Sequence, residues 1–498
     1  NIDLNNPNYG WQWYRQNVSI VRRKTETQGV HFDLTYGDDD LRFKVGAAYD
    51  RAKRSVRAYD NSAAYQASVC GSTCAGTTGS ITNSQISQYL LASSVNNFGH
   101  LGSNGGYTSF ITPNFDAIIN ATNYNAYRDS APETRSAVTG TATGDVDEKV
   151  WGAYFEINGR TELFGRELNV NAGLRYAHTD QLVVGPGTLG NQIVDFSAKS
   201  KYENFLPSLN VTYSVADQVK LRFSASKTMT RPEAGRILPG VTFSDPSGLI
   251  ASVGNPDLKP YTSENFDFGG EVYTGGIGYV GVSLFQKKVN GFTTISTTTQ
   301  SFGSLGIPFD SLQSTQQLAM QDRAARTNTT IADLPVAVSR PVNLDMLRIR
   351  GVEATWVQPL DFLIKGIGFS ANGTYLEQSS STALVAEGIP KWSYNLQGFY
   401  ENNGLSVSVN YVWNDKSVAL NGPQNGRPPS ESLNNDARGQ LDMSAGYQLP
   451  FMNNAFRLTL DVLNITNEPL RTTFGYDNAA YSVYYPGRQI LAGIRANF

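Results

Sequence analysis

The carboxy-terminal stretch decides the fold class of this 498-residue chain; it reads Tyr485-Pro486-Gly487-Arg488-Gln489-Ile490-Leu491-Ala492-Gly493-Ile494-Arg495-Ala496-Asn497-Phe498. One set of alternate positions is apolar: Ile490, Ala492, Ile494, Ala496 and Phe498. The other set holds Gln489, Gly493, Arg495 and Asn497, with Leu491 as the exception. Successive side chains of a strand point to opposite faces, so one face meets lipid and the other meets water. The stretch is long enough to span a bilayer and predicts the closing strand of a transmembrane antiparallel β-barrel.

The composition also favours a barrel over ordinary soluble domains. The chain has 47 Gly, 26 Tyr and 24 Phe, and 17% of its residues are charged. It contains no run of about 18 apolar residues, as a membrane-spanning helix would need. The mean hydropathy of −0.32 resembles that of a soluble protein, but barrel strands give such values because lipid-facing and lumen-facing residues alternate. A net charge of −3 without a basic stripe argues against nucleic acid as a partner.

The same alternation recurs along the chain between short turns and long loops. Short turns are predicted at Gly37-Asp38-Asp39-Asp40, Phe164-Gly165-Arg166, Ala216-Asp217-Gln218, Gly275-Gly276, Asp361 to Lys365, Asn402-Asn403-Gly404 and Met452-Asn453-Asn454. Long loops are predicted near 60–145, 180–199, 229–256, 291–345, 379–390, 415–437 and 466–484. In outer-membrane barrels, periplasmic turns are short and extracellular loops are long. The turns are therefore expected in the periplasm and the loops outside the cell.

The predicted strands number about fifteen, whereas bacterial single-chain barrels have even numbers of strands. One explanation is a further strand within residues 1–16, since a sixteen-stranded barrel would suit a porin. The other is that the chain is the C-terminal part of a larger, plugged barrel of about 22 strands.

Several segments, in order, resemble the TonB-dependent receptors. They are Ser226-Lys227-Thr228-Met229-Thr230-Arg231-Pro232-Glu233, Gly254-Asn255-Pro256-Asp257-Leu258-Lys259-Pro260-Tyr261-Thr262-Ser263-Glu264-Asn265-Phe266-Asp267, Arg350-Gly351-Val352-Glu353, Pro390-Lys391-Trp392-Ser393-Tyr394-Asn395 and Leu463-Asn464-Ile465-Thr466-Asn467. The resemblance covers roughly residues 220–498, and its style looks most like the large receptors of Xanthomonas- and Caulobacter-type bacteria. Tyr261 departs from the commoner family form, which has Glu at that position.

The resemblance implies a 22-stranded barrel, an N-terminal plug and a box that contacts TonB. Neither the plug nor the box is recognisable here, so both, with about seven first strands, are expected upstream of Asn1. The resemblance also implies that the terminal Phe498 is an assembly signal for the barrel-assembly machinery. The expected location is the Gram-negative outer membrane, in contact with its lipid and lipopolysaccharide.

Few residues suggest chemistry other than binding. Cys70 and Cys74, in the longest loop, are expected to form a local disulfide in an oxidising exterior. His31, His100 and His178 are scattered, and Asp38-Asp39-Asp40 lacks the Gly and Glu of a calcium loop. No nucleophile is paired with a base, so neither a metal, a cofactor nor catalysis is predicted.

The best ligand candidates are aromatic, amide and charged residues in the outer loops, because flat rings with polar partners suit sugar-like or aromatic ligands. They are Tyr124, Tyr127, Trp413, Asn414, Asp415, Arg471, Tyr476, Tyr481 and Tyr484. The alternative interpretation is that Tyr and Trp at strand ends belong to the aromatic girdle of a barrel. Arg231-Pro232-Glu233 is either a rim ion pair or a ligand contact.

Three functions remain open from the sequence. The first is TonB-dependent uptake of a scarce or bulky extracellular ligand. The family resemblance favours a saccharide over a siderophore or an aromatic compound. The second is a passive porin in which loop 60–145 or 291–345 folds inward as a constriction. The third is a barrel used for binding or adhesion through its loops.

Overall fold

The protein was analysed as a computed structural model of the whole chain. The residues that the structure describes are 5–6, 16–70, 89–91, 111–134, 143–189, 192–238, 240–243, 247–312, 314–343, 346–380, 385–420, 432–450, 455–474, 476 and 479–496. The predicted disulfide and the predicted assembly signal involve Cys74 and Phe498, which lie outside these ranges, so both remain predictions.

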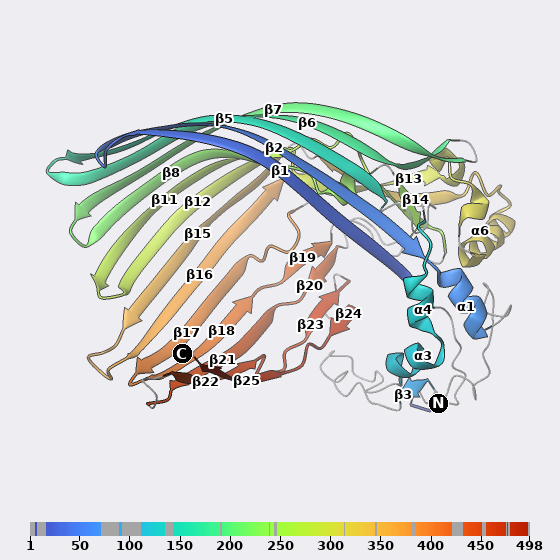
Figure 1. Cartoon of the computed structure of the whole chain (residues 1–498). Helices are drawn as coiled ribbons and strands as arrows, with labels where there is room; N and C mark the ends of the chain where they lie inside the picture. Colours follow the sequence, from blue (N-terminus) through green and yellow to red (C-terminus); the bar gives the residue numbers. More distant parts are fainter. Residues whose placement is uncertain are drawn as a thin grey trace.

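Fifteen strands form one antiparallel sheet, the wall, as the sequence predicted (Figure 1). In spatial order they are β1 (Ser19–Gly37), β2 (Leu41–Asp60), β5 (Gly144–Leu163), β6 (Arg166–Leu189), β7 (Gln192–Ala216), β8 (Val219–Thr230), β11 (Tyr261–Gly275), β12 (Gly278–Asn290), β15 (Met346–Pro359), β16 (Ile367–Ser380), β17 (Trp392–Asn402), β18 (Leu405–Asn414), β21 (Arg438–Gln448), β22 (Phe456–Leu463) and β25 (Gln489–Ala496). This order follows the chain, so each wall strand pairs with the next wall strand.

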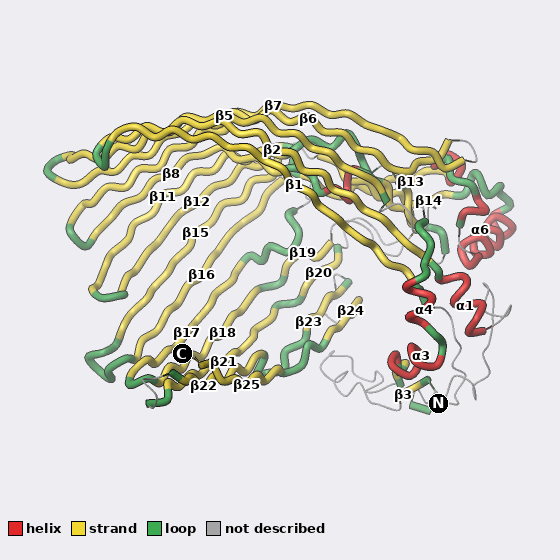
Figure 2. Tube along the Cα trace, viewed as in Figure 1, coloured by secondary structure: helices red, strands yellow, loops and turns green. Residues whose placement is uncertain are grey.

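Short turns join the wall strands at one end and long connections join them at the other, on the right of the view (Figure 2). At the short end, Asn402 pairs with Leu405 across Asn403 and Gly404, which have φ values of 49° and 77°. Two positive φ values favour Asn-Gly, and the resulting turn matches the twist of the strands. This tight turn is where the sequence predicted it.

The two edges of the wall do not meet. β1 and β25 stand at opposite ends of the strand order and do not pair with each other. Almost every residue of β1 and every residue of β25 is exposed. The sheet therefore curls into an open barrel with a gap between its first and last strands (Figure 1).

Two of the long connections fold together into a second sheet, the loop unit. Its members are β9 (Val241–Phe243), β10 (Ile250–Val253), β13 (Thr293–Ser301), η4 (Phe302–Leu305), η5 (Phe309–Ser311), α6 (Ser314–Thr327) and β14 (Pro335–Asn343). Phe302, Met320 and Leu334 are buried in its core. The sequence predicted a long loop near 291–345, and the structure shows that this connection contains β13, α6 and β14.

A third sheet and several short helices complete the loop end. The sheet contains β19 (Ser417–Leu420), β20 (Leu433–Asn435), β23 (Leu470–Thr473) and β24 (Ala480–Tyr484). The remaining elements are α1 (Ser62–Cys70), β3 (Leu90–Leu91), β4 (Thr112–Pro113), α3 (Phe115–Ala121), α4 (Tyr124–Asp129) and α5 (Ala234–Ile237). No helix among the described residues is both long enough and apolar enough to cross a membrane.

The loop predicted over 180–199 is mostly strand. β6 continues to Leu189, and β7 begins at Gln192. The register shows why the sequence missed the extension: Asp180 pairs with Lys201, and Leu182 pairs with Lys199, so polar and apolar side chains mix on the outward face and the alternation is lost. The hairpin therefore projects beyond the part of the wall that carries a continuous apolar face.

Candidate functional site

The outer face of the wall is apolar and carries paired aromatic rings towards the loop end. Phe268 pairs with Phe223 on one side and Leu284 on the other, and all three side chains are exposed. Tyr375 and Trp392 have ring centroids 4.4 Å apart. Tyr and Trp concentrate at membrane–water interfaces, so this row marks the boundary of the hydrocarbon region near the loop end.

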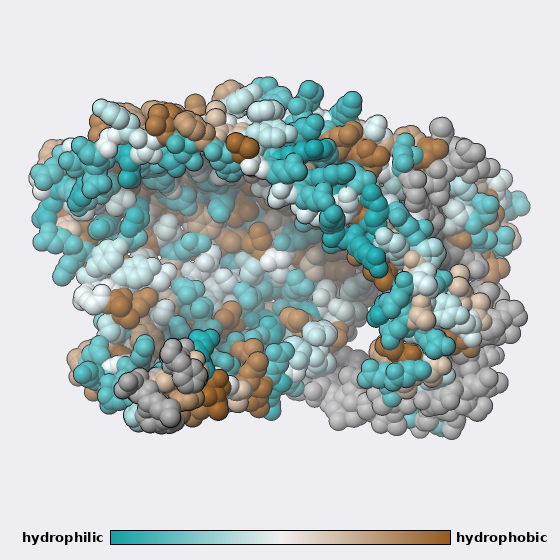
Figure 3. All heavy atoms as spheres, viewed as in Figure 1, coloured by the Kyte–Doolittle hydropathy of each residue, from teal (hydrophilic) through white to brown (hydrophobic). Residues whose placement is uncertain are grey.

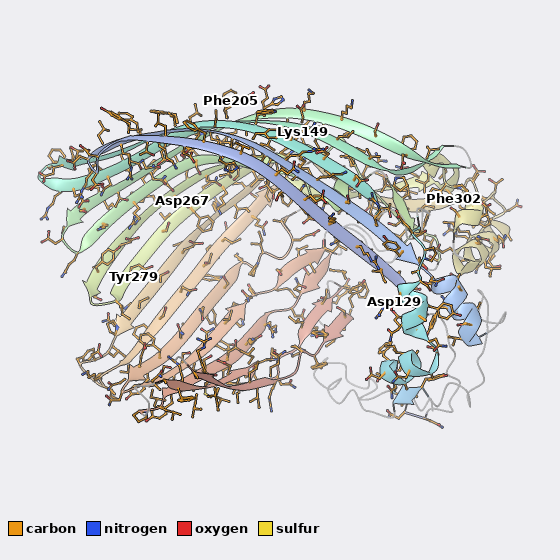
Figure 4. All side chains as sticks on the ribbon, viewed as in Figure 1. Asp129, Lys149, Phe205, Asp267, Tyr279 and Phe302 are labelled. Carbon is orange, nitrogen blue, oxygen red and sulfur yellow. The ribbon has the colours of Figure 1, made fainter. Side chains whose placement is uncertain are left out.

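The opposite face of the wall is polar and surrounds the hollow seen between the two sheet edges (Figure 3). Arg222 Nε donates to Glu271 Oε1 over 2.7 Å, and Ser224 Oγ donates to Asp267 Oδ2 over 3.2 Å. With Tyr279, these residues help to line a cavity of about 350 Å³ near the turns. Asp267 and Tyr279 come from the neighbouring strands β11 and β12 (Figure 4).

A second cavity, the mouth pocket, lies where β8 reaches the loop end, on the same inner face. Its volume is about 310 Å³. It is lined by Thr230, Arg231, Pro232, Glu233, Arg236, Tyr261, Phe292, Thr293, Thr294, Ala386 and Glu387. These residues come from the end of β8 and the connection with α5 that follows it, the start of β11, the start of β13 with the residue before it, and the connection before β17. The pocket therefore joins the wall to the loop unit.

The mouth pocket combines aromatic rings with unused hydroxyl groups. The rings of Tyr261 and Phe292 meet edge to face with centroids 6.0 Å apart. The hydroxyl oxygens of Thr293 and Thr294 are buried and have no hydrogen-bond partner among the described residues. Buried polar groups are normally hydrogen-bonded. The two hydroxyls therefore have unused hydrogen-bonding capacity, and their covered oxygens lie within the wall of the pocket.

Arg231 is held in place from behind the pocket. Its Nη2 donates to Thr179 Oγ1 over 3.1 Å, and its Nε lies 3.9 Å from Glu148 Oε1. Glu148 is almost fully buried and also accepts hydrogen bonds from Arg54 and Gln181. A buried carboxylate is stable only when it is paired, so this group fixes the Arg231 guanidinium at the edge of the pocket.

The structure divides the predicted ligand residues into three groups rather than one site. Tyr124 and Tyr127 lie on α4, where their rings pack against Tyr65 with centroid distances of 5.5 and 5.6 Å. Burial raises the pKa of Tyr65, although its hydrogen bond to Thr122 opposes the shift. These tyrosines hold α1 and α4 together.

The second group lies on the third sheet and the connection within it. Arg471 forms an ion pair with Asp436 at 2.9 Å, and both side chains are largely buried. Tyr476, Tyr481 and Tyr484 are exposed.

The third group lies at the end of β18. Trp413 stacks on Tyr394 with centroids 5.2 Å apart. Tyr394 lies on the same face of β17 as Leu396, which is exposed on the apolar outer face. Since Trp413 pairs with Tyr394, its ring also lies on the outer face. Asn414 is on the opposite face, and Asp415 accepts a hydrogen bond from the Lys416 backbone N–H.

None of the predicted ligand residues lines the mouth pocket. Sequence reasoning singled out Arg231-Pro232-Glu233 but missed Phe292, Thr293 and Thr294. One signal was present, because Tyr261 occupies the position at which the chain departs from the family form. Tyr261 is the first residue of β11, and its ring packs on Phe292.

Comparison with known families gives one match, and it covers most of the chain. The family model described as "TonB dependent receptor-like, beta-barrel" matches residues 1–465. The comparison with curated proteins finds no match.

Solved structures share the fold at low sequence identity. The copper transporter OprC is 14% identical with a TM-score of 0.54, and the match covers 96% of this chain and 58% of that one. The FrpB iron transporter (F3-3 variant) from Neisseria meningitidis is 13% identical with a TM-score of 0.50, over 96% and 55% of the two chains. The ferripyoverdine receptor of the outer membrane of Pseudomonas aeruginosa is 14% identical with a TM-score of 0.51, over 96% and 49%. The chain thus spans about half the length of the structures it matches.

Proposed function

The chain belongs to the TonB-dependent receptor family, and from that premise we propose that it forms much of the wall of an energised importer in the outer membrane. The single observation that carries the proposal is the pair of cavities on the polar inner face. Arg222 in the lower cavity and Thr230 in the mouth pocket are eight residues apart on β8, or about 26 Å along the strand. A ligand bound at the mouth would therefore face a polar route towards the turn end.

The ligand that we propose is a saccharide. Sugars have hydroxyl groups that exchange hydrogen bonds and apolar C–H faces that pack on rings. The mouth pocket offers both kinds of contact, through polar lining residues such as Thr230, Glu233 and Arg236 and through the rings of Tyr261 and Phe292. A siderophore or an aromatic compound is the alternative, since the similar solved structures include a copper transporter and an iron transporter.

The proposal includes parts beyond the fifteen wall strands. An open sheet edge cannot face lipid, because its backbone N–H and C=O groups would stay unpaired. β1 and β25 are such edges. We propose that about seven further strands close the barrel and that a plug inside it contacts TonB. Binding of ligand to loops and plug would then be coupled to the proton gradient of the inner membrane.

The first test uses the full-length receptor in cells that lack competing receptors. Uptake of a labelled oligosaccharide is measured with and without a protonophore. Energised import predicts that accumulation stops when the proton gradient collapses. Uptake that continues would support the passive porin, and surface binding without any uptake would support the adhesion function.

The second test addresses the ligand class. Tyr261→Ala and Phe292→Ala are expected to weaken saccharide binding about tenfold each, as loss of an aromatic contact does in a well-packed site. Tyr394→Ala removes an aromatic ring from the outer face and should leave binding unchanged. If a pocket variant binds the saccharide normally but no longer binds a ferric siderophore, the result would contradict the saccharide proposal and support a siderophore as the ligand.

A further inference from the structure

A group of basic side chains faces outward just above the apolar band, at the loop end of the wall. This group, the cationic rim, consists of Lys227, Lys288, Arg348, Arg350 and Lys391. It is unrelated to the mouth pocket, which lies on the inner face.

The strand register places most of the rim in two adjacent rows on the outer face. Lys227 pairs with Glu264, Glu264 with Lys288, and Lys288 with Arg348, which makes one row across four strands. In the next row towards the turns, Arg350 pairs with Glu377. In each strand the rim residues are an even number of positions from the apolar residues of the outer face, so their side chains also point away from the lumen.

The row below the rim is entirely apolar or aromatic. It runs from β8 to β17 through Phe223, Phe268, Leu284, Val352, Tyr375 and Trp392. Lys391 lies over the ring of Tyr375, with its Nζ 5.3 Å from the centroid. Since Tyr375 and Trp392 mark the membrane boundary, the rim lies one to four residues above it along the tilted strands, or about 3–13 Å. Lipid headgroups occupy that depth.

The charges of the rim do not cancel within the protein. Glu264 lies 3.8 Å from Lys288, while Glu377 lies 3.3 Å from Arg350 and 3.9 Å from Lys391. Within the described part of the chain, no carboxylate forms an ion pair with Lys227 or Arg348. Five cations against two carboxylates leave a net charge of +3 on this part of the outer surface.

Two basic side chains of β2 and β7, at the same end of the wall, offer a contrast. Arg51 donates to both carboxylate oxygens of Asp147, at 2.9 and 2.7 Å. Lys201 lies 2.8 Å from Asp180. Arg51 and Lys201 are neutralised by these direct partners, so they have less need of an external anion than Lys227 and Arg348.

We propose that the cationic rim binds the phosphate groups of an anionic glycolipid in the outer leaflet. Lys and Arg form strong hydrogen bonds with phosphate oxygens, and basic residues at a membrane surface attract anionic lipids. The partner is a membrane lipid rather than a soluble anion, because the basic groups stand directly above the lipid-facing rings. The receptor would thereby hold a shell of lipid on one side of its circumference.

The experiment titrates bisphosphorylated lipid A into the detergent-solubilised full-length receptor and counts bound lipids by native mass spectrometry. Arg348→Gln/Arg350→Gln is expected to weaken binding about tenfold, whereas Arg348→Lys/Arg350→Lys keeps the charge and should retain most of it. The matched control Arg51→Gln/Lys201→Gln removes the same number of cations, both already paired with carboxylates, and should change binding little.

Two further arms identify the anion. Lipid A without phosphates should bind equally weakly to all variants, and millimolar inorganic phosphate should not displace the bound lipid. The proposal is overturned if the Arg348/Arg350 glutamine variant binds like the wild type, if the matched control loses as much, or if inorganic phosphate competes on equal terms.

Discussion

The wall and the loop unit are both β-sheets, but their apolar side chains face different surroundings. In the wall, large apolar residues such as Leu284 are exposed on the outer face. In the loop unit, Phe302 and Leu334 are buried in a core that α6 helps to cover. The wall is stabilised by strand pairing and by lipid, and the loop unit by a hydrophobic core of the kind found in soluble proteins. The same chain thus places its apolar side chains on the outside of the sheet within the membrane and in a buried core beyond the membrane boundary.

The largest expected effect is a core truncation in the loop unit. Phe302→Ala removes a buried ring that packs against Phe243 and Phe309, at centroid distances of 6.1 and 6.3 Å. Such truncations cost about 3–5 kcal/mol. Limited proteolysis should show cleavage within 291–345 while the wall remains intact. Cleavage of the wall strands at the same time would contradict the separate stabilisation of the wall and the loop unit.

A charge on the outer face tests the wall in turn. Leu284→Arg places a cation against the hydrocarbon region and is expected to destabilise the barrel by about 2–4 kcal/mol, as measured by urea unfolding in lipid vesicles. Ser283→Arg, one residue away on the polar face, is the matched control and should have a much smaller effect. Equal effects of the two substitutions would contradict the assignment of the faces.

Substitutions in the tight turns at the short end are expected to lower the stability of the wall by a moderate amount. Gly404 has a φ of 77°, and a Cβ there would meet Gln448 atoms at 3.2 Å. Gly404→Ala is expected to cost about 1–2 kcal/mol, because a side chain disfavours the left-handed conformation. Gly398→Ala in β17, where a Cβ would meet nothing within 4 Å, is the comparison. The urea midpoints of the two variants should differ accordingly.

The smallest effect concerns a periplasmic turn and depends on pH. Hydrogen bonds from the backbone N–H groups of Leu41 and Asp40 lower the pKa of Asp38. A lowered pKa stabilises the fold above the pKa of the unfolded state, about 3.9, and the contribution is lost as the pH falls through the folded pKa. Asp38→Ala should slightly lower the urea midpoint at pH 7 but not at pH 2. A difference that persists at pH 2 would exclude the ionised carboxylate as its cause.

The wall was predictable from the sequence because its signals are local. Alternation of apolar and polar residues and turns such as Asn403-Gly404 are visible over a few residues, and they gave the number of strands in the sheet. The loop unit was not predictable in this way. Its strand β13 is mostly Thr and Ser, and its core forms only when two distant connections meet.

The mouth pocket escaped prediction for a related reason. Tyr261 and Phe292 are 31 positions apart and become neighbours only because β11 and β12 pair along their length. For Trp413, residue type and a place at a strand end suggested a ligand contact, whereas strand register determines the face on which its ring lies. Residue type indicates what a side chain can bind, and register decides what it can reach.

The loop unit begins and ends at paired wall positions. Thr230 pairs with Tyr261, and Asn290 pairs with Met346, so each of its two connections returns to the neighbouring strand beside the point where it left. A single connection of this kind could be exchanged between receptors without changing the register of the barrel. Here β10 of one connection pairs with β14 of the other, and they share one core. A chimera that replaces only one connection would therefore keep only half of this core, so the two connections have to be exchanged as a pair.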